Sequence, residues 1–99
     1  MDIKKTKNGE NLVIELVGRL DTTTAPQLDE VVKNELSGIT ALSFDLANLE
    51  YISSAGLRVL LAAQKVMNKQ GEMVVKNAKE DIMEVFDITG FADILTIEN

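Results

Sequence analysis

Cysteine, histidine and tryptophan are all absent from the 99 residues of this sequence. Without cysteine, the chain can form neither disulfide bonds nor thiolate metal sites. Without histidine, it lacks the commonest metal ligand and the usual general base near neutral pH. A Ser-His-Asp hydrolase, a zinc enzyme and a histidine phosphotransfer protein are therefore excluded. The sequence also has no evident paired-carboxylate motif and no glycine-rich phosphate loop. We expect a protein that is not an enzyme and has no metal, cofactor or catalytic residue.

Acidic residues outnumber basic residues in this sequence. Ten Lys and Arg stand against sixteen Asp and Glu, which gives a net charge of −6. Such a surface repels phosphate backbones, and one Tyr with three Phe offers few rings for base stacking, so direct nucleic-acid binding is not expected. The charged segment 1–10 does not resemble a signal peptide, and uninterrupted apolar runs are only a few residues long. We expect a cytoplasmic protein that is not inserted into a membrane.

Apolar residues are plentiful enough for a core, at 45% of the chain. No linker, repeat or low-complexity segment interrupts the sequence, so we expect a single domain over residues 1–99. Alternating or continuous apolar runs predict strands over residues 3–7, 11–17, 41–46, 73–75 and 94–97. The dipeptide Asn8-Gly9 predicts a two-residue hairpin between the first two strands.

Helical spacing of apolar residues predicts three helices, which alternate with the later strands. The first begins at Thr24, which would form a capping box with Gln27, and ends at Ser37-Gly38. The others run over residues 54–69 and 79–88. The order β-β-α-β-α-β-α-β predicts an α/β fold with a mixed central sheet and helices packed against it.

The segment around Gly56 is unusual, because glycine in a first helical turn costs about 0.5–1 kcal/mol relative to alanine. Gly56 either packs against a neighbouring element or lets another molecule approach the backbone. Ser54 is predicted as the N-cap of this helix, and most such serines do nothing else. A helix N-terminus is also where an added phosphate is well tolerated, so Ser54 could be modified without unfolding the helix.

The predicted helix places Ser54, Arg58, Leu61 and Lys65 in one row along its solvent side. Its core side is predicted to carry Val59, Leu60, Ala63, Val66 and Met67. Leu61 beside Arg58 could contact a partner, although a single exposed leucine is common. Asp21 follows a core strand, as Ser53-Ser54 does, and functional crevices lie at such strand ends. Asp21 either caps its own turn or helps to orient the Ser54 hydroxyl.

Three short motifs in this sequence resemble those of the STAS domain family, and specifically of the bacterial anti-sigma factor antagonists. Residues 17–22 contain Gly-Arg-Leu-Asp, which is similar to the G-x-L-D turn of that family. Residues 44–57 are similar to its D-L…[FY]-[IM]-D-S-[ST]-G-L segment. Residues 71–75 and 85–91 are similar to its G-x-x-[LV] strand and F-x-x-x-G-[LF] ending. The resemblance spans essentially the whole chain.

The resemblance implies a binding switch. In such proteins, the serine two positions before the motif glycine is phosphorylated by an anti-sigma factor that is also a serine kinase, and a phosphatase reverses this. That serine is Ser54 here. The unphosphorylated form binds the anti-sigma factor and releases the sigma factor. Together with the row on the helix face, this predicts a partner contact at Ser53, Gly56, Arg58 and Leu61, with Asp21 nearby. We expect a monomer.

Two positions depart from the family pattern. Ser53 stands where an acidic residue is common, and Ala55 where Ser or Thr is common. Ser53 could therefore act as a second phosphate acceptor. Ser54 is favoured, because it is the serine two positions before Gly56. An alternative function is a STAS subunit of a membrane transport complex, such as a lipid ABC transporter, in which Ser54 would only cap its helix.

Overall fold

Five strands form one mixed sheet in the order β1-β2-β3-β4-β5, in a computed structural model that describes residues 1–98. Strand β1 is antiparallel to β2, and the other neighbours are parallel. The elements are β1 (Asp2–Asn8), β2 (Asn11–Leu20), α1 (Ala25–Glu35), β3 (Ala41–Ile52), α2 (Ser54–Met67), β4 (Glu72–Lys76), α3 (Glu80–Thr89), the short 3₁₀ helix η1 (Phe91–Asp93) and β5 (Ile97–Glu98).

The predicted element order and the mixed sheet are confirmed, with differences at both ends of the chain. Asn8 pairs with Asn11, so the hairpin loop is Gly9-Glu10 and not the predicted Asn8-Gly9. Gly9 has a φ of +64°, which suits the first central position of a tight hairpin turn. The last strand begins at Ile97 and not at Ile94, because η1 continues the chain in a helical turn that Ile94 closes.

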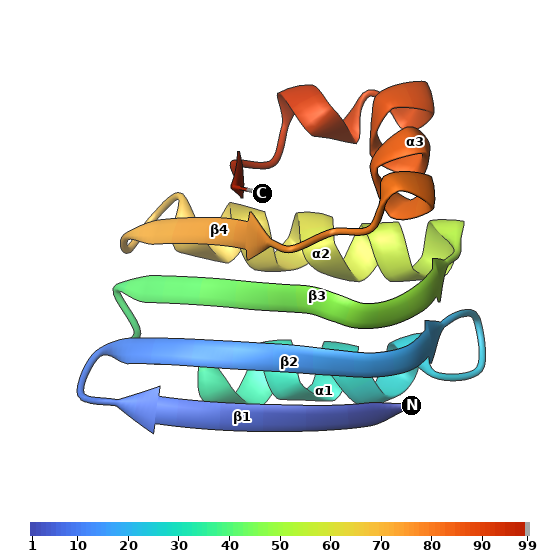
Figure 1. Cartoon of the computed structure of the whole chain (residues 1–99). Helices are drawn as coiled ribbons and strands as arrows, with labels where there is room; N and C mark the ends of the chain where they lie inside the picture. Colours follow the sequence, from blue (N-terminus) through green and yellow to red (C-terminus); the bar gives the residue numbers. More distant parts are fainter. Residues whose placement is uncertain (99) are drawn as a thin grey trace.

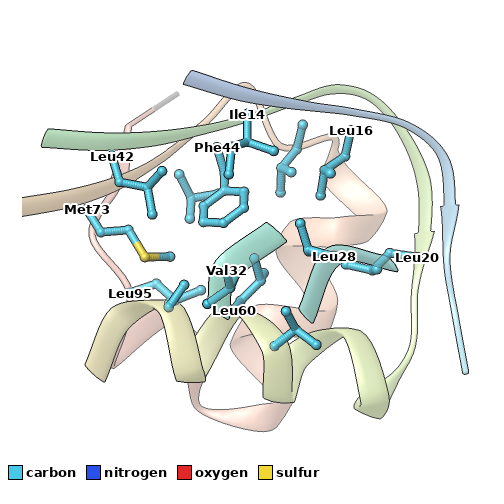
Figure 2. Packing of buried hydrophobic residues seen from close by; sticks show 14 of the residues in the cluster. Ile14, Leu16, Leu20, Leu28, Val32, Leu42, Phe44, Leu60, Met73 and Leu95 are labelled. Carbon is cyan, nitrogen blue, oxygen red and sulfur yellow. The ribbon is translucent and has the colours of Figure 1, made fainter. Parts of the chain in front are cut away.

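Helices α1 and α2 cover one face of the sheet (Figure 1). Leu12, Ile14 and Leu16 of β2 point into this layer, and the register sets Leu12 beside Leu42 and Ile14 beside Phe44. In Figure 2, Leu28, Val32 and Leu60 from the helices lie opposite Ile14, Leu16, Leu42 and Phe44 of the sheet. Each fully buried aliphatic or aromatic side chain contributes about 1.5–3 kcal/mol, so this single layer supplies most of the driving force for folding.

Strand β3 is twice as long as predicted. Two irregularities break its alternation of buried and exposed residues, but the strand continues past them. Its buried residues are Leu42, Phe44, Leu46, Leu49 and Ile52, and the spacing changes from two to three after Leu46. The register with β2 shifts at the same places, so β3 contains extra residues relative to β2. Such bulges bend a strand, and the end of β3 curves toward α2 (Figure 1).

Both predicted helix caps need correction. The Thr24 side chain does not cap α1, because its hydroxyl is 2.8 Å from the carbonyl oxygen of Arg19 and accepts the amide hydrogen of Asp21. The predicted capping box with Gln27 is therefore not formed. Helix α2 has Ser53 as its N-cap, and Ser54 is its first helical residue.

The core side of α2 also differs at one position from the prediction. Val59, Leu60, Ala63 and Met67 are buried as predicted, but Val66 is 37% exposed. Val66 lies about 100° around the helix axis from Met67, at the margin of the buried stripe. Gln64 occupies the other side of that stripe and is buried instead.

Candidate functional site

The ends of β2 and β3 meet at one edge of the sheet and bring two turns together. Leu20 pairs with Ile52 in the parallel register, and the amide of Ser53 donates to the carbonyl oxygen of Leu20 at 2.9 Å. The turn that begins at Asp21 and the start of α2 at Ser53 therefore lie next to each other. The predicted common location of Asp21 and Ser53-Ser54 follows from this pairing.

The two serines have different roles in the structure. Ser53 has an extended backbone, and its hydroxyl oxygen accepts a hydrogen bond from the Gly56 amide at 3.3 Å. Ser54 is one residue further on, in the first turn of α2, and is exposed. Capping thus occupies the hydroxyl of the half-buried Ser53, while the exposed Ser54 takes no part in the cap.

Gly56 is buried, and the surrounding atoms explain the absence of a side chain. A Cβ atom at this position would lie 2.6 and 2.9 Å from Cγ and Cδ2 of Leu20, and 3.1 Å from Cγ1 of Ile52. Gly56 therefore lets the first turn of α2 sit directly on the ends of β2 and β3. Of its two interpretations, packing has a clear structural cause, since the missing Cβ points into the core.

The Asp21 carboxylate holds its own turn. One oxygen accepts the amide hydrogens of Thr23 at 3.0 Å and Thr24 at 3.1 Å, and the Arg19 side chain lies 3.8 Å from the other. These contacts lower the pKa of Asp21, and the hydrogen bond from the Thr24 amide has the largest effect. Burial raises the pKa, but the Thr23 amide, the Thr24 hydroxyl and the Arg19 charge add to the lowering. These contacts support the capping interpretation of Asp21 and leave the Ser54 hydroxyl to other partners.

A pair of residues that the sequence analysis missed lies at the same edge. The Arg19 guanidinium is 4.3 Å from the centre of the Tyr51 ring, and the two residues are cross-strand neighbours in β2 and β3. Tyr51 is 41% exposed. The predicted strands stopped at residues 17 and 46, short of this pair. Extending them at the register of Leu12 with Leu42 would pair Arg19 with Leu49. The two bulges of β3 bring Tyr51 to that position instead, so the pair does not follow from the sequence pattern.

The exposed side of α2 is basic, although the chain as a whole is acidic. No Asp or Glu occurs between Glu50 and Glu72, whereas Arg58, Lys65 and Lys69 all lie in that interval. The three basic residues are exposed, as expected for the predicted solvent side, whereas Leu61 is half-buried. No ion pair to Arg58 is found among the residues that the structure describes. Ser54, Arg58, Leu61 and Lys65 therefore form a positively charged surface, here called the α2 face.

The α2 face combines an exposed serine with exposed basic side chains. Within residues 1–98, no group of three or more acidic side chains is placed to hold a metal ion. No helix in that range is long and apolar enough to cross a membrane. The site offers an exposed hydroxyl at a helix start, flanked by cations one and three turns further along the helix.

Comparison with known proteins identifies the family. The family model described as "STAS domain" matches residues 2–99. The chain belongs to the STAS domain family. A Bordetella bronchiseptica relative, BtrV, is named as an anti-sigma factor antagonist; it is 40% identical over 90 residues, which cover 89% of this chain and 78% of BtrV. The anti-sigma-B factor antagonist of Bacillus subtilis is 31% identical over 98 residues, which cover 98% of this chain and 88% of that protein.

Solved structures share the STAS fold. An anti-sigma factor antagonist from Mycobacterium paratuberculosis has a TM-score of 0.87 at 22% identity, covering 97% of this chain and 83% of that one. SpoIIAA in its phosphorylated form has a TM-score of 0.77 at 18% identity, covering 99% and 92%. A sulfate transporter family protein from Wolinella succinogenes also has a TM-score of 0.77, at 16% identity, covering 92% and 75%. At these identities the likeness establishes the fold alone.

Substituting Gly56 tests the close contact between α2 and β2. The variant Gly56→Ala places a methyl group against Leu20, and we expect a loss of about 1–3 kcal/mol in the free energy of unfolding, measured by urea denaturation. In a Leu20→Ala background most of the obstructing atoms are gone. Adding Gly56→Ala to that background should cost much less. Equal costs in the two backgrounds would contradict the contact.

Substituting Asp21 tests the charge of its turn. Because its pKa is lowered in the folded state, the ionised carboxylate stabilises the fold at pH values above the unfolded pKa of about 4. That stabilisation is lost as the pH falls through the folded-state pKa. Asp21→Asn should therefore be less stable than the unmodified protein at pH 7 and closer to it at pH 3 in urea denaturation. A pH-independent difference would contradict the role of the charge.

Proposed function

We propose that this protein is a cytoplasmic anti-sigma factor antagonist whose binding is controlled by phosphorylation of Ser54. The unphosphorylated form binds an anti-sigma factor through the α2 face and thereby releases the sigma factor. The same anti-sigma factor acts as the serine kinase, and a phosphatase restores the unphosphorylated form. The protein is active as a monomer.

The main support is the exposed hydroxyl of Ser54 beside a serine that already caps the helix. Because Ser53 supplies the cap through its bond to the Gly56 amide, modifying Ser54 removes no hydrogen bond on which the start of α2 depends. A phosphate at this position also meets the positive end of the helix dipole. The fold therefore persists while the surface changes, as a reversible switch requires.

Charge explains how the phosphate would prevent binding. A phosphoserine carries roughly −1.5 to −2 charges at pH 7. On Ser54 it would lie one helical turn from Arg58, a separation at which opposite charges attract. The phosphate would then occupy Arg58 and add a desolvation cost to the α2 face, so a partner surface that fits the unmodified cation is no longer matched.

The relatives favour this function over a transporter subunit. The curated proteins that are 31% and 40% identical to this chain are both named as anti-sigma factor antagonists. The transporter-family structure has the same fold at only 16% identity. A transporter subunit would dock permanently and would use Ser54 only as a cap, but Ser53 is the cap in this chain.

A negative charge at residue 54 should weaken binding to the anti-sigma factor. We expect Ser54→Asp to fold normally and to bind the anti-sigma factor kinase at least about tenfold more weakly, as measured by isothermal titration calorimetry. Ser54→Ala should bind like the unmodified protein and resist inactivation by ATP and kinase. Ser37→Asp, an exposed serine beyond α1, serves as the matched control. Equal affinities for Ser54→Asp and the unmodified protein would refute the mechanism.

Ser53 provides the complementary control, because its role is structural. Ser53→Ala should lower the free energy of unfolding by about 1 kcal/mol through loss of the cap. Phosphate incorporation, measured by intact mass and peptide mapping, should remain at Ser54. Phosphate that maps to residue 53 in the unmodified protein would reverse the assignment.

Arg58 should contribute to binding of the unphosphorylated form. Arg58→Gln is expected to weaken the anti-sigma factor complex about fivefold at low salt and to reduce the dependence of Kd on ionic strength. Arg58→Lys should retain part of this effect. Lys4→Gln, on β1 and away from the α2 face, is the control of equal charge change. An unchanged salt dependence in Arg58→Gln would exclude Arg58 from the contact.

A further inference from the structure

The hairpin between β1 and β2 lies at the end of the sheet opposite the start of α2 (Figure 1). One residue of its loop is fixed to the next strand. The carbonyl oxygen of Glu10 accepts the amide hydrogens of Thr40 at 2.9 Å and Ala41 at 3.3 Å, which holds Glu10 at the start of β3. The peptide bond between Asn8 and Gly9 therefore joins the edge strand β1 to a loop that is held at its other end.

Asn8 and Gly9 are both unprotected. Asn8 is exposed, and its side-chain amide makes no hydrogen bond with another described residue. Gly9 is exposed as well, and its amide donates no hydrogen bond within residues 1–98. Apart from its chain neighbours, no heavy atom lies within 4 Å of the Cβ position that Gly9 lacks. The side-chain carbonyl of Asn8 and the nitrogen of Gly9 are thus next to each other in the chain, with solvent around both.

An asparagine followed by glycine contains both partners of a ring-closing reaction. The Gly9 nitrogen can attack Cγ of Asn8, because glycine has no side chain to shield that nitrogen and permits the backbone rotations that the attack requires. The amide hydrogen of Gly9 leaves with the side-chain nitrogen of Asn8 as ammonia, and a five-membered succinimide ring closes. Water then opens the ring at either carbonyl carbon. Opening at the main-chain bond gives isoaspartate, and opening at the Cγ bond gives aspartate.

The place of Asn8 in the ladder lets its backbone reach the required geometry. Ring closure needs rotation about the Cα–C bond of Asn8, away from the extended conformation of a strand. Asn8 is the last residue of β1, and its pair with Asn11 is the last one before the loop. Opening this pair permits the rotation and leaves the pairing from Lys7 with Leu12 onward intact. Such local opening at the end of an element costs far less free energy than unfolding the whole domain.

The other asparagines that the structure describes lack this combination. Asn8 is the one asparagine in the sequence that is followed by glycine. Asn48 and Asn77 in addition donate their side-chain amide hydrogens to carboxylates, at 3.1 and 3.2 Å. These hydrogen bonds hold the side chains away from the main-chain nitrogen that would attack them. The sequence and the contacts therefore single out Asn8.

We propose that Asn8 is a site of spontaneous deamidation, at which the protein acquires isoaspartate or aspartate as it ages. Both products add a negative charge. Isoaspartate also directs the main chain through Cβ, which places one extra atom between Cα of residue 8 and Gly9. Because Glu10 is fixed to β3, β1 must take up this extra length by losing its last pair with β2 or by shifting along it. The site is at the opposite end of the sheet from Ser54 and does not depend on the function of that serine.

Ageing the folded, full-length protein in mildly alkaline buffer tests the proposal. Intact mass should rise by the difference between an amide and a carboxylic acid group, and cleavage after glutamate should map the change to segment 1–10. The isoaspartate fraction should accept a methyl group from S-adenosylmethionine in the presence of an isoaspartyl methyltransferase, which does not modify ordinary aspartate. No mass change, or a change that maps only to other segments, would overturn the proposal.

A pair of matched variants identifies the reacting residue. Asn8→Gln keeps an exposed amide but adds a methylene, so that closure would need a six-membered ring, and the mass change should be lost. Asn11→Gln makes the same substitution on the opposite strand, at an exposed position followed by leucine, and should deamidate like the unmodified protein. Thermal unfolding verifies that both variants are folded. Equal mass change in Asn8→Gln and the unmodified protein would overturn the proposal.

Hydrogen exchange in the aged protein tests the effect on the sheet. In the isoaspartate form, separated by ion exchange, amides of β1 should exchange faster than in fresh protein, and amides of α2 should be unchanged. The aspartate form, which has the same added charge and an unaltered main chain, is the control and should exchange like fresh protein. Equal exchange of β1 in the isoaspartate and aspartate forms would refute the effect of the lengthened chain.

Discussion

The parallel pairing of β2 with β3 holds the functional end of the molecule together. At its last position, Leu20 lies beside Ile52, its carbonyl receives the amide of Ser53, and its side chain fills the space left by Gly56. One backbone hydrogen bond and one close packing contact thus determine where α2 starts. The direction of α2 follows from that start, and with it the positions of Ser54 and the α2 face.

The fold was predictable because its signals are local and agree with one another. Alternating Leu12, Ile14 and Leu16 could only be a half-buried strand, and the helical stripes fit the layer that covers it. The errors occur where a residue's surroundings decide the outcome. The end of β3 was missed because bulges break its period of two. On α2, Gln64 is buried and the predicted core residue Val66 is exposed, because the position of the sheet decides which residues at the two margins of the apolar stripe are covered.

The candidate site was predictable in location but not in detail. The sequence pattern predicted Ser54 as the N-cap of a helix and Asp21 at a neighbouring strand end. Asp21 does follow the end of β2 beside the start of α2, but the N-cap is Ser53 and Ser54 is the first helical residue. Assigning the cap required coordinates, because Ser53 and Ser54 are chemically identical and differ only in backbone conformation. Thr24 illustrates the same limit, since its hydroxyl turns back to Arg19 although its sequence context is typical of a capping box.

The stacking of Arg19 on Tyr51 has an optical consequence. Tyr51 is the only tyrosine, and the chain has no tryptophan, so excitation near 280 nm yields emission from one ring alone. That ring is two residues from Ser53 and 41% exposed, with a guanidinium 4.3 Å from its centre. Its intensity and its access to quenchers report on this end of the sheet. The protein thus carries an intrinsic fluorophore beside its candidate switch, and binding can be followed without a label.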